Sequence, residues 1–468
     1  MHKLTLFCLS ILLFSISIGV RAEITRVVAT DSGELGQYGD RRYIWVKATF
    51  EGTVNRTDGS SGSYRVPVTL YYSDKPTARP GLIDLIDSAS YGIYAANKGP
   101  FGKRNLYRIS EIMFGDHLWN EGFHSMNLQW ARRVTWVRGA DYGVIDNARD
   151  GYLIWQDAAD FFRNPAHIEG NVAFQPKKTE QVIAFGYSQP ASLLDTFVRR
   201  GMNRRANGQL VFDGILSTAT SVGKTCRDLV NDETFAPPPA PQNPSFEKTT
   251  SCDIQMPPHG KFISIPTQTD VAFDSGHLNR DNSPDFYRQY ELAGISHIPS
   301  NQLPLKIIGA NRQNPADQKP FYRAALNNLA DWLVDGVAPP PSAYLDGHIN
   351  NEGKFEYQLD DDGNVVGGIR LPHMTQTIGN GEIAGVPLGV YTGVEPRLAS
   401  DGFGYFSGTF TPFTPAEFNE RYADDATIEK RVVRAADALL AQRYIVKRDH
   451  AAYVNGARYW KSRYVALQ

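Results

Sequence analysis

A serine between an apolar run and an amphipathic run has the clearest chemistry in this sequence. Residues 182–187 read Val-Ile-Ala-Phe-Gly-Tyr, Ser188 follows, and an amphipathic pattern begins at Ala191. A strand, a tight turn and a helix in this order hold a serine hydroxyl exposed, and backbone N–H groups of the turn stabilise the oxyanion that forms when it attacks a carbonyl. The sequence therefore predicts a nucleophile elbow at Ser188, with the N–H of Gln189 as one oxyanion donor.

The elbow departs from the usual pattern at one position. Gly186 is small enough for the turn to close, but Pro190 stands where a second glycine is usual. Proline is tolerated in the first turn of a helix, where N–H groups have no partner within the helix. The added bulk of Pro190 can also tighten or shift the turn, so a catalytically silent ligand-binding protein is the alternative interpretation.

A serine nucleophile needs a base and an orienting acid, which follow it in the order acid, then histidine, in such folds. The apolar run 262–270 ends in Asp270, and the run 290–297 ends in His297. Parallel strands bring their carboxyl ends to one edge of a sheet. We therefore expect His297 to take the proton from Ser188 and Asp270 to orient the imidazole.

Other assignments of the acid and the base remain open at this point. Asp270 is also a candidate cap of a helix or turn, in which case Asp274 or Asp285 would be the acid. Asp213, in Phe-Asp-Gly after the following strand, is a more distant choice that we interpret as structural. His297 has the alternative interpretation of an ordinary loop histidine.

A second cluster of potential ligands lies earlier in the chain. Asp116, His117, Glu121 and His124 are close together in the sequence, with apolar residues among them. Their spacing fits no recognised metal-ligand motif. We expect no metal site here, and the chemistry expected at Ser188 needs no cofactor.

The elements around these residues alternate between strands and helices. Apolar runs predict strands at 42–50, 66–72, 81–86, 126–130, 181–185, 210–216, 262–266 and 290–295. Helical patterns at 150–162 and 191–200 lie between them. The first two runs, joined by a Gly/Ser-rich turn at 58–62, predict an antiparallel hairpin. The remainder predicts an α/β fold, with a mostly parallel sheet covered by helices on both faces.

Two further regions flank this core. Residues 217–260 contain the run Phe-Ala-Pro-Pro-Pro-Ala-Pro, which is typical of polyproline, and we interpret them as a lid-like insertion near the site. Residues 410–468 predict C-terminal helices that pack onto the main sheet. One begins at Thr414-Pro415, a longer one is capped by Asp424 or Asp425, and Asp449 is the expected cap of the last.

Composition argues against a nucleic-acid-binding protein, and the N-terminal sequence predicts an exported one. The 468 residues carry 48 Lys+Arg and 50 Asp+Glu, a net charge of −2 without large blocks of one sign, so nucleic-acid binding is not expected. Residues 1–22 have the pattern of a secretory signal with cleavage after Ala22, and no later segment is long and apolar enough to span a membrane. We expect export to the periplasm or the medium. There, Cys226 and Cys252 would form a disulfide.

Several short motifs together resemble the alpha/beta-hydrolase domain proteins of a poorly characterised group whose elbow usually reads Gly-Tyr-Ser-Gln-Ser-Gly. The elbow here reads Gly-Tyr-Ser-Gln at 186–189, and later matches are Val-Phe-Asp-Gly at 211–214, Thr-Asp at 269–270, Ala-Gly-x-x-His at 293–297 and a Trp-x-x-Asp-Gly segment at 332–336. Gln268 stands where the family commonly has Glu. The resemblance covers most of residues 23–468 and implies one elaborated alpha/beta-hydrolase domain.

The resemblance also implies an activity. It suggests a serine hydrolase of carboxylic esters, with Ser188, Asp270 and His297 as its triad and a small-molecule ester as substrate. The second oxyanion donor of such enzymes comes from the loop after the third strand, which here contains Ser88. A peptidase or an acyltransferase with the same triad is the alternative within this class.

Overall fold

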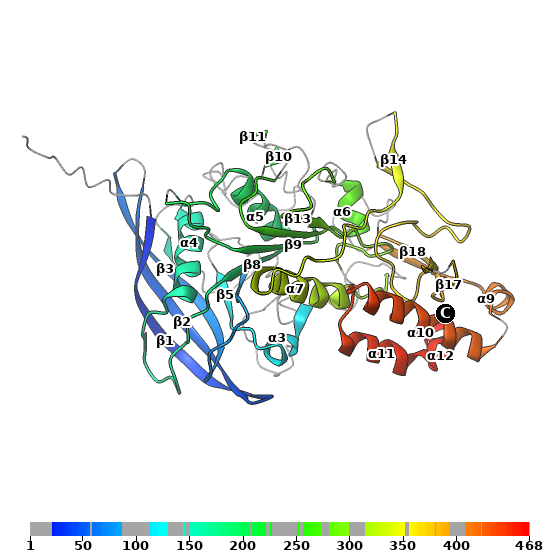
Figure 1. Cartoon of the computed structure of the whole chain (residues 1–468), viewed down its shortest axis with the longest axis horizontal. Coiled ribbons are helices and arrows are strands. Elements are labelled where there is room, and N and C mark those ends of the chain that lie inside the picture. The colour runs from blue at the N-terminus through cyan, green and yellow to red at the C-terminus, as the bar shows by residue number, and fades with distance from the viewer. Residues whose placement is uncertain are drawn as a thin grey trace, which may run out of the picture.

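A large, mostly parallel β-sheet forms the centre of the molecule (Figure 1). The computed structural model describes residues 21–56, 59–86, 113–129, 144–145, 150–205, 207–220, 225–226, 250–251, 256–273, 280–298, 314–351, 355–379, 381–393, 408–422 and 424–467. Within these residues the main sheet has 11 strands. They are β1 (Arg21–Tyr38), β2 (Arg41–Asn55), β3 (Ser61–Ser73), β4 (Gly81–Ile86), β5 (Ser125–Gln129), β6 (Val144–Ile145), β7 (Ile168–Glu169), β8 (Val182–Tyr187), β9 (Gly214–Thr218), β12 (Lys261–Ile265) and β13 (Tyr287–Gln289).

The sheet has a parallel half and an antiparallel half. Its order is β13-β12-β9-β8-β4-β5-β3-β2-β1-β7, with β6 paired to β3. All neighbours from β13 to β5 are parallel. Strands β1, β2 and β3 pair antiparallel and form the long blue ribbons at one end of Figure 1. The carboxyl ends of the parallel strands therefore meet at one edge, where sheets of this kind assemble their sites.

Helices cover both faces of the parallel half. The helices of the main body are α3 (His117–Asn120), α4 (Gly151–Arg163), α5 (Gln189–Arg199), α6 (Gln268–Phe273) and α7 (Lys319–Val334). Helices α4 and α5 share one buried apolar cluster with the sheet, whereas α3 and α7 belong to the cluster on the opposite face. Figure 1 shows α5 above β9 and α7 below β8.

The C-terminal region adds short hairpins and a group of helices to the end of the molecule opposite β1–β3 (Figure 1). The short strands of this region are β14 (Gly347–Ile349), β15 (Phe355–Tyr357), β16 (Gln376–Thr377), β17 (Ile383–Ala384), β18 (Gly389–Thr392) and β19 (Thr409–Pro412), whereas β10 (Thr225–Cys226) and β11 (Thr250–Ser251) pair with each other earlier in the chain. The helices are α9 (Pro415–Arg421), α10 (Asp425–Ala441), α11 (Lys447–Ala457) and α12 (Trp460–Ala466). No helix among the described residues combines the length and the apolar character needed to cross a bilayer.

The expected α/β architecture is confirmed, including the antiparallel hairpin of β2 and β3. The expected strand at 290–295 is wrong, because the edge strand β13 spans Tyr287–Gln289. Beyond it the chain makes only isolated bridges, such as that of Leu292 with Thr267, and Gly294 then adopts a positive φ of 64°. A left-handed glycine turns the chain away from the extended direction. The expected strand at 210–216 begins later, at Gly214, and β1 is an element that the apolar pattern did not predict.

The helix starts of the C-terminal region are partly confirmed. Thr414 caps α9 in a capping box with Glu417, and Asp424, not Asp425, caps α10. The expectation that Asp449 caps the last helix is wrong. Asp449 lies in the first turn of α11, and its carboxylate binds the guanidinium of Arg323 at 2.5 Å.

The lid-like insertion lies mostly outside the described residues. Its expected first residues, 217 and 218, belong to β9. Within the insertion the structure describes the antiparallel pair of β10 and β11, in which Cys226 lies opposite Thr250. Cys252, the expected disulfide partner of Cys226, lies outside the described residues, as does most of the expected signal at 1–22.

Candidate active site

Ser188 lies on a strained turn between β8 and α5. Its φ of 62° and ψ of −121° are unusual for a residue with a side chain. The turn is held from both sides, because the Ser188 N–H donates to the carbonyl of Thr218 on β9 at 2.9 Å and the Ser188 carbonyl accepts the N–H of Ser192 in α5 at 3.1 Å. The local sequence thus forms the strand, tight turn and helix that the pattern predicted.

The two residues that flank the elbow have different steric requirements. A Cβ on Gly186 would lie 2.7 Å from the Ala191 nitrogen and 2.9 Å from the Pro190 carbonyl carbon, so this position accepts only glycine without a shift of α5. Pro190 itself occupies the first turn of α5. Because N–H groups there have no intrahelical partner, proline fits without the loss of a helix hydrogen bond.

His297 connects the other two predicted residues. Its Nε2 lies 2.9 Å from Ser188 Oγ, and its Nδ1 lies 2.6 Å from Asp270 Oδ1. The imidazole side chain is 13% exposed and the Asp270 side chain 3%, so the histidine faces the solvent side and the carboxylate lies beneath it. All three residues come from the carboxyl edge of the parallel strands, in the order that the sequence predicted.

Asp270 also serves the cap-like role that was the alternative interpretation. It lies in the first turn of α6, and its Oδ2 accepts the N–H of Thr267 at 2.8 Å and the hydroxyl of Thr267 at 2.7 Å. The same carboxylate therefore holds its turn with one oxygen and contacts His297 with the other. Charge-assisted hydrogen bonds of this kind restrict the carboxylate to one orientation.

A buried chain of side chains holds the backbone of the histidine. The hydroxyl of Tyr187, the residue before Ser188, donates to the carbonyl of His297. Gln318 Nε2 donates to the Tyr187 hydroxyl at 3.2 Å, and the Tyr322 hydroxyl donates to Gln318 Oε1 at 2.9 Å. The sequence analysis missed these residues, because Gln318 and Tyr322 are more than 100 positions from Ser188 and carry no motif.

The structure describes one of the two predicted oxyanion donors, the backbone N–H of Gln189. Gln189 is the first residue of α5, directly after Ser188, so its backbone N–H belongs to the first turn. N–H groups of a first turn are available to an anion. Ser88 lies outside the described residues.

The two alternative acids that the structure describes, Asp213 and Asp285, have other surroundings. Asp213 binds Arg163 at 2.8 Å and accepts the N–H of Val182 at 2.8 Å, at the opposite end of β8 from Ser188. Asp285 is exposed, and its carbonyl accepts Lys261 Nζ. Asp274 lies outside the described residues. The structural interpretation of Asp213 is therefore confirmed.

The early cluster of potential ligands is engaged in contacts of other kinds. Asp116 binds Arg448 at 2.6 Å, and His117 Nε2 contacts the side chain of Asn327 at 3.1 Å. His124 Nε2 lies 3.1 Å from Ser73 Oγ, and burial lowers the pKa of His124 to about 4. Among the described residues, no group of three or more His, Cys, Asp or Glu side chains could hold a metal ion.

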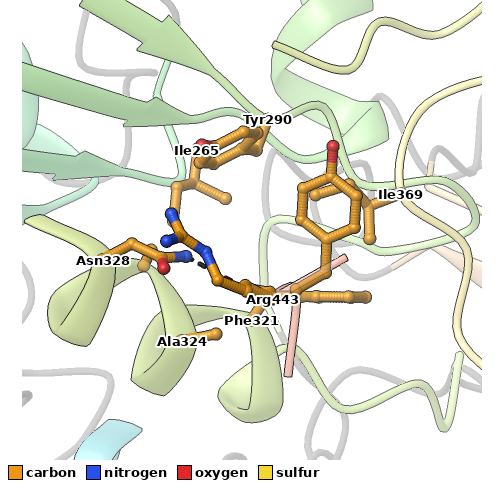
Figure 2. Close-up of a pocket in the computed structure, with 9 residues that line it drawn as sticks. Ile265, Tyr290, Phe321, Ala324, Asn328, Ile369 and Arg443 are labelled. Carbon is orange, nitrogen blue, oxygen red and sulfur yellow. Dashed lines mark hydrogen bonds between the residues drawn. The ribbon is translucent and has the colours of Figure 1, made fainter. Parts of the chain in front are cut away.

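A small cavity shown in Figure 2 is lined by none of the predicted site residues and lies between α7 and the chain that leaves α10. Its volume of about 10 Å³ has room for about one water molecule. Its polar groups hold backbone carbonyls, since Asn328 Nδ2 donates to Arg443 O at 2.9 Å and the Tyr290 hydroxyl donates to Pro340 O at 2.8 Å. The cavity is thus a small gap in the packing of α7 against the C-terminal region.

Comparison with known proteins identifies a family. Residues 127–455 match the family described as alpha/beta hydrolase domain, whereas no curated protein matches the chain. Solved structures with some similarity include an arylesterase, with 12% identity and a TM-score of 0.34 over 61% of this chain and 85% of its own. A thermostable esterase from Pseudomonas putida has 10% identity and a TM-score of 0.32, over 62% and 83%. An acetyl xylan esterase from Thermoanaerobacterium has 10% identity and a TM-score of 0.28, over 57% and 82%.

Proposed function

The chain belongs to the alpha/beta hydrolase domain family, and we propose that it hydrolyses carboxylic esters through a covalent acyl-enzyme on Ser188. One observation carries the proposal. Ser188, His297 and Asp270 form an unbroken line of hydrogen bonds of 2.9 and 2.6 Å, with the serine on a strained turn. This is the arrangement of nucleophile, base and orienting acid that acyl transfer requires.

In the first half of the reaction, Ser188 Oγ attacks the ester carbonyl carbon and its proton passes to His297 Nε2. The carbonyl oxygen becomes an oxyanion, and the N–H of Gln189 at the start of α5 is a donor for it. The bond to the alcohol oxygen then breaks as the imidazolium returns the proton to that oxygen. The products of this half are a free alcohol and an ester of Ser188.

In the second half, water replaces the serine as nucleophile. His297 removes a proton from the water as its oxygen attacks the acyl carbon, and returns that proton to Ser188 Oγ as the acid leaves. Asp270 keeps the Nδ1–H of His297 pointing inward through both halves. It thereby leaves Nε2 free to accept a proton and stabilises the imidazolium that forms.

Export forms a second part of the proposal. The pattern of residues 1–22 supports secretion to the periplasm or the medium, and the two cysteines that follow it, Cys226 and Cys252, support a disulfide within the insertion. Mass spectrometry of exported protein, alkylated before and after reduction, tests both points. A chain that begins at Met1, or thiols that alkylate without reduction, would contradict them.

The catalytic proposal is tested with a fluorophosphonate probe and short-chain aryl esters on purified protein. We expect the wild type to be labelled at one site and to hydrolyse the esters, and Ser188→Ala to do neither. Ser73→Ala is the matched control, because Ser73 also contacts a histidine, His124, but its hydroxyl donates to the carbonyl of Lys75 and it is fully buried. That variant keeps both labelling and hydrolysis.

The outcomes separate the alternatives. A wild type that binds no probe and cleaves no ester would support the silent binding protein. Labelling at Ser188 without ester hydrolysis, but with cleavage of peptides or acyl transfer to an added alcohol, would replace esterase by peptidase or acyltransferase.

A further inference from the structure

Two side chains just before Asp270, at the start of α6, contact both the loop that carries His297 and the hairpin of β18 and β19. This loop, residues 290–298 after β13, is called the histidine loop below. Thr269 Oγ1 accepts the backbone N–H of His297 at 3.0 Å and donates its own hydrogen to the carbonyl of Gly393. Gln268 Oε1 accepts the N–H groups of Gly294 at 3.1 Å and of Gly393 at 3.2 Å. Each side chain thus holds the histidine loop with one contact and the residue after β18 with another.

Asn314 forms a third connection of the same kind. Its Nδ2 donates to the carbonyl of Gly294 at 2.6 Å and to the carbonyl of Thr392, the last residue of β18, at 3.0 Å. Gln268, Thr269 and Asn314 are all buried. Buried polar groups have no bulk water to replace a lost partner, so displacement of the hairpin would leave several of them without a hydrogen bond.

The hairpin also touches the histidine loop directly. A Cβ on Gly393 would lie 2.9 Å from the carbonyl oxygen of Ile295 and 2.6 Å from the Cβ of Gln268. A Cβ on Gly408, on the other side of the hairpin, would lie 3.0 Å from the Cβ of Ser296. Only glycine lets the two backbones approach so closely, next to the two residues that precede His297.

The C-terminal helices anchor the base of this hairpin. Trp460 Nε1 of α12 donates to the carbonyl of Val386 at 3.0 Å, just before β18. The Tyr464 hydroxyl, also on α12, donates to the carbonyl of Phe413 at 2.8 Å, just after β19. The hairpin is therefore a rigid connection between α12 and the loop that carries His297.

We propose that the hairpin β18–β19 positions the catalytic base, and that Thr269 is the positioning residue through which it acts. The inference rests on the proposed function, since it assigns a role to His297 as base. The hydroxyl of Thr269 ties the main chain of His297 to the hairpin, and Asp270 follows Thr269 directly. A shift of the hairpin would change the distances from His297 to both Ser188 and Asp270, and displacements of about 1 Å at a reacting group can cost about 100-fold in rate.

Steady-state kinetics of three variants test the role of Thr269. Thr269→Val removes the hydroxyl at nearly constant volume, and we expect kcat for an aryl ester to fall by about 10- to 100-fold with little change in KM. Thr269→Ser keeps the hydroxyl and should recover most of the loss. Thr179→Val is the matched control, because Thr179 is a buried threonine that donates to the carbonyl of Gln181 at 3.1 Å, at the far end of β8. It should retain wild-type kcat.

A second pair of variants tests the hairpin itself. Gly393→Ala introduces the Cβ that would collide with Gln268 and Ile295, and we expect the same selective loss of kcat and a similar slowing of fluorophosphonate labelling. Gly379→Ala is its control, since a Cβ at Gly379 would meet nothing within 4 Å. Thermal unfolding of each variant shows whether the fold persists at the assay temperature.

The results distinguish this inference from the proposed function. A wild type that labels at Ser188, with Thr269→Val and Gly393→Ala folded and within twofold of its kcat, would overturn the inference alone. So would equal losses in Thr269→Val, Thr269→Ser and Thr179→Val, which would indicate a general packing defect. A wild type that neither labels nor hydrolyses would overturn both.

Discussion

The hydroxyl of Tyr187 donates a hydrogen bond to the backbone carbonyl of His297. Tyr187 is the residue immediately before the elbow serine, whereas His297 is 109 positions from that serine along the chain. Ser188 and His297, which would exchange a proton, already contact each other through Oγ and Nε2. The bond from Tyr187 is a second contact between the chain at the elbow and His297.

Loss of this contact should slow the reaction. We predict that Tyr187→Phe lowers kcat by about tenfold, because the carbonyl of His297 loses its donor and the loop gains freedom. Steady-state kinetics with an aryl ester measure the effect. Tyr290→Phe is the control, since it removes a buried tyrosine hydroxyl that donates to Pro340 O at 2.8 Å, away from the reacting atoms. Equal kcat values in the two variants would contradict the prediction.

Replacement of the Asp270 carboxylate by an amide should lower kcat far more than Tyr187→Phe does. In Asp270→Asn, an NH₂ group facing His297 Nδ1 would disfavour the tautomer that leaves Nε2 able to accept a proton. In the opposite orientation the NH₂ group would face the N–H of Thr267 and lose that hydrogen bond, and in both cases the negative charge that stabilises the imidazolium is gone. We expect kcat to fall by about 10³- to 10⁴-fold with little change in KM. Asp285→Asn, at an exposed carboxylate, is the control and should behave as wild type. A loss below tenfold in Asp270→Asn would remove Asp270 from the triad.

Pro190 should be tolerated by the elbow. Because Pro190 lies in the first turn of α5, replacement by the glycine usual at this position gains no helix hydrogen bond. We expect Pro190→Gly to keep kcat within about threefold and to lower the unfolding free energy by about 0.5 to 1 kcal/mol through the entropy of the unfolded chain. Kinetics and urea unfolding measure the two quantities. A large gain in kcat would show that proline impairs the turn.

The substitution Gly186→Ala tests the opposite side of the same turn. Its Cβ would press against Ala191 and Pro190 at 2.7 to 2.9 Å, so α5 or Ser188 must move. We predict a lower melting temperature and at least a tenfold slower reaction with the fluorophosphonate probe. A variant that labels at the wild-type rate would show that the elbow accommodates the methyl group.

A buried carboxylate away from the site should make stability depend on pH. Burial raises the pKa of Asp157, which accepts a hydrogen bond from the Tyr64 hydroxyl, to about 7. The folded state therefore keeps a proton that the unfolded chain releases near pH 4, and the unfolding free energy falls by up to about 1.4 kcal/mol per pH unit between about pH 4 and 7. We predict that Asp157→Asn reduces this slope. Urea unfolding at pH 5 and at pH 7.5 measures it, and an unchanged slope would contradict the prediction.

The sequence by itself determined the local parts of the site. Gly186, Ser188 and the apolar and amphipathic runs beside them act within one strand, one turn and one helix, so their pattern predicts the elbow directly. Asp270 and His297 could be predicted as acid and base because they follow apolar runs in the expected order. The run before His297 is nevertheless a loop with isolated β-bridges and not a strand.

Only the tertiary structure decided what holds these residues in place. The contacts of Tyr187, Gln318 and Tyr322, and those of Thr269 and Asn314 with the β18–β19 hairpin, join positions far apart along the chain. Such hydrogen bonds leave no periodic pattern in the sequence, because any buried polar side chain can meet any backbone group that the fold brings to it. The groups that we propose to react are therefore visible in the sequence, whereas the contacts that align them form only when the chain has folded.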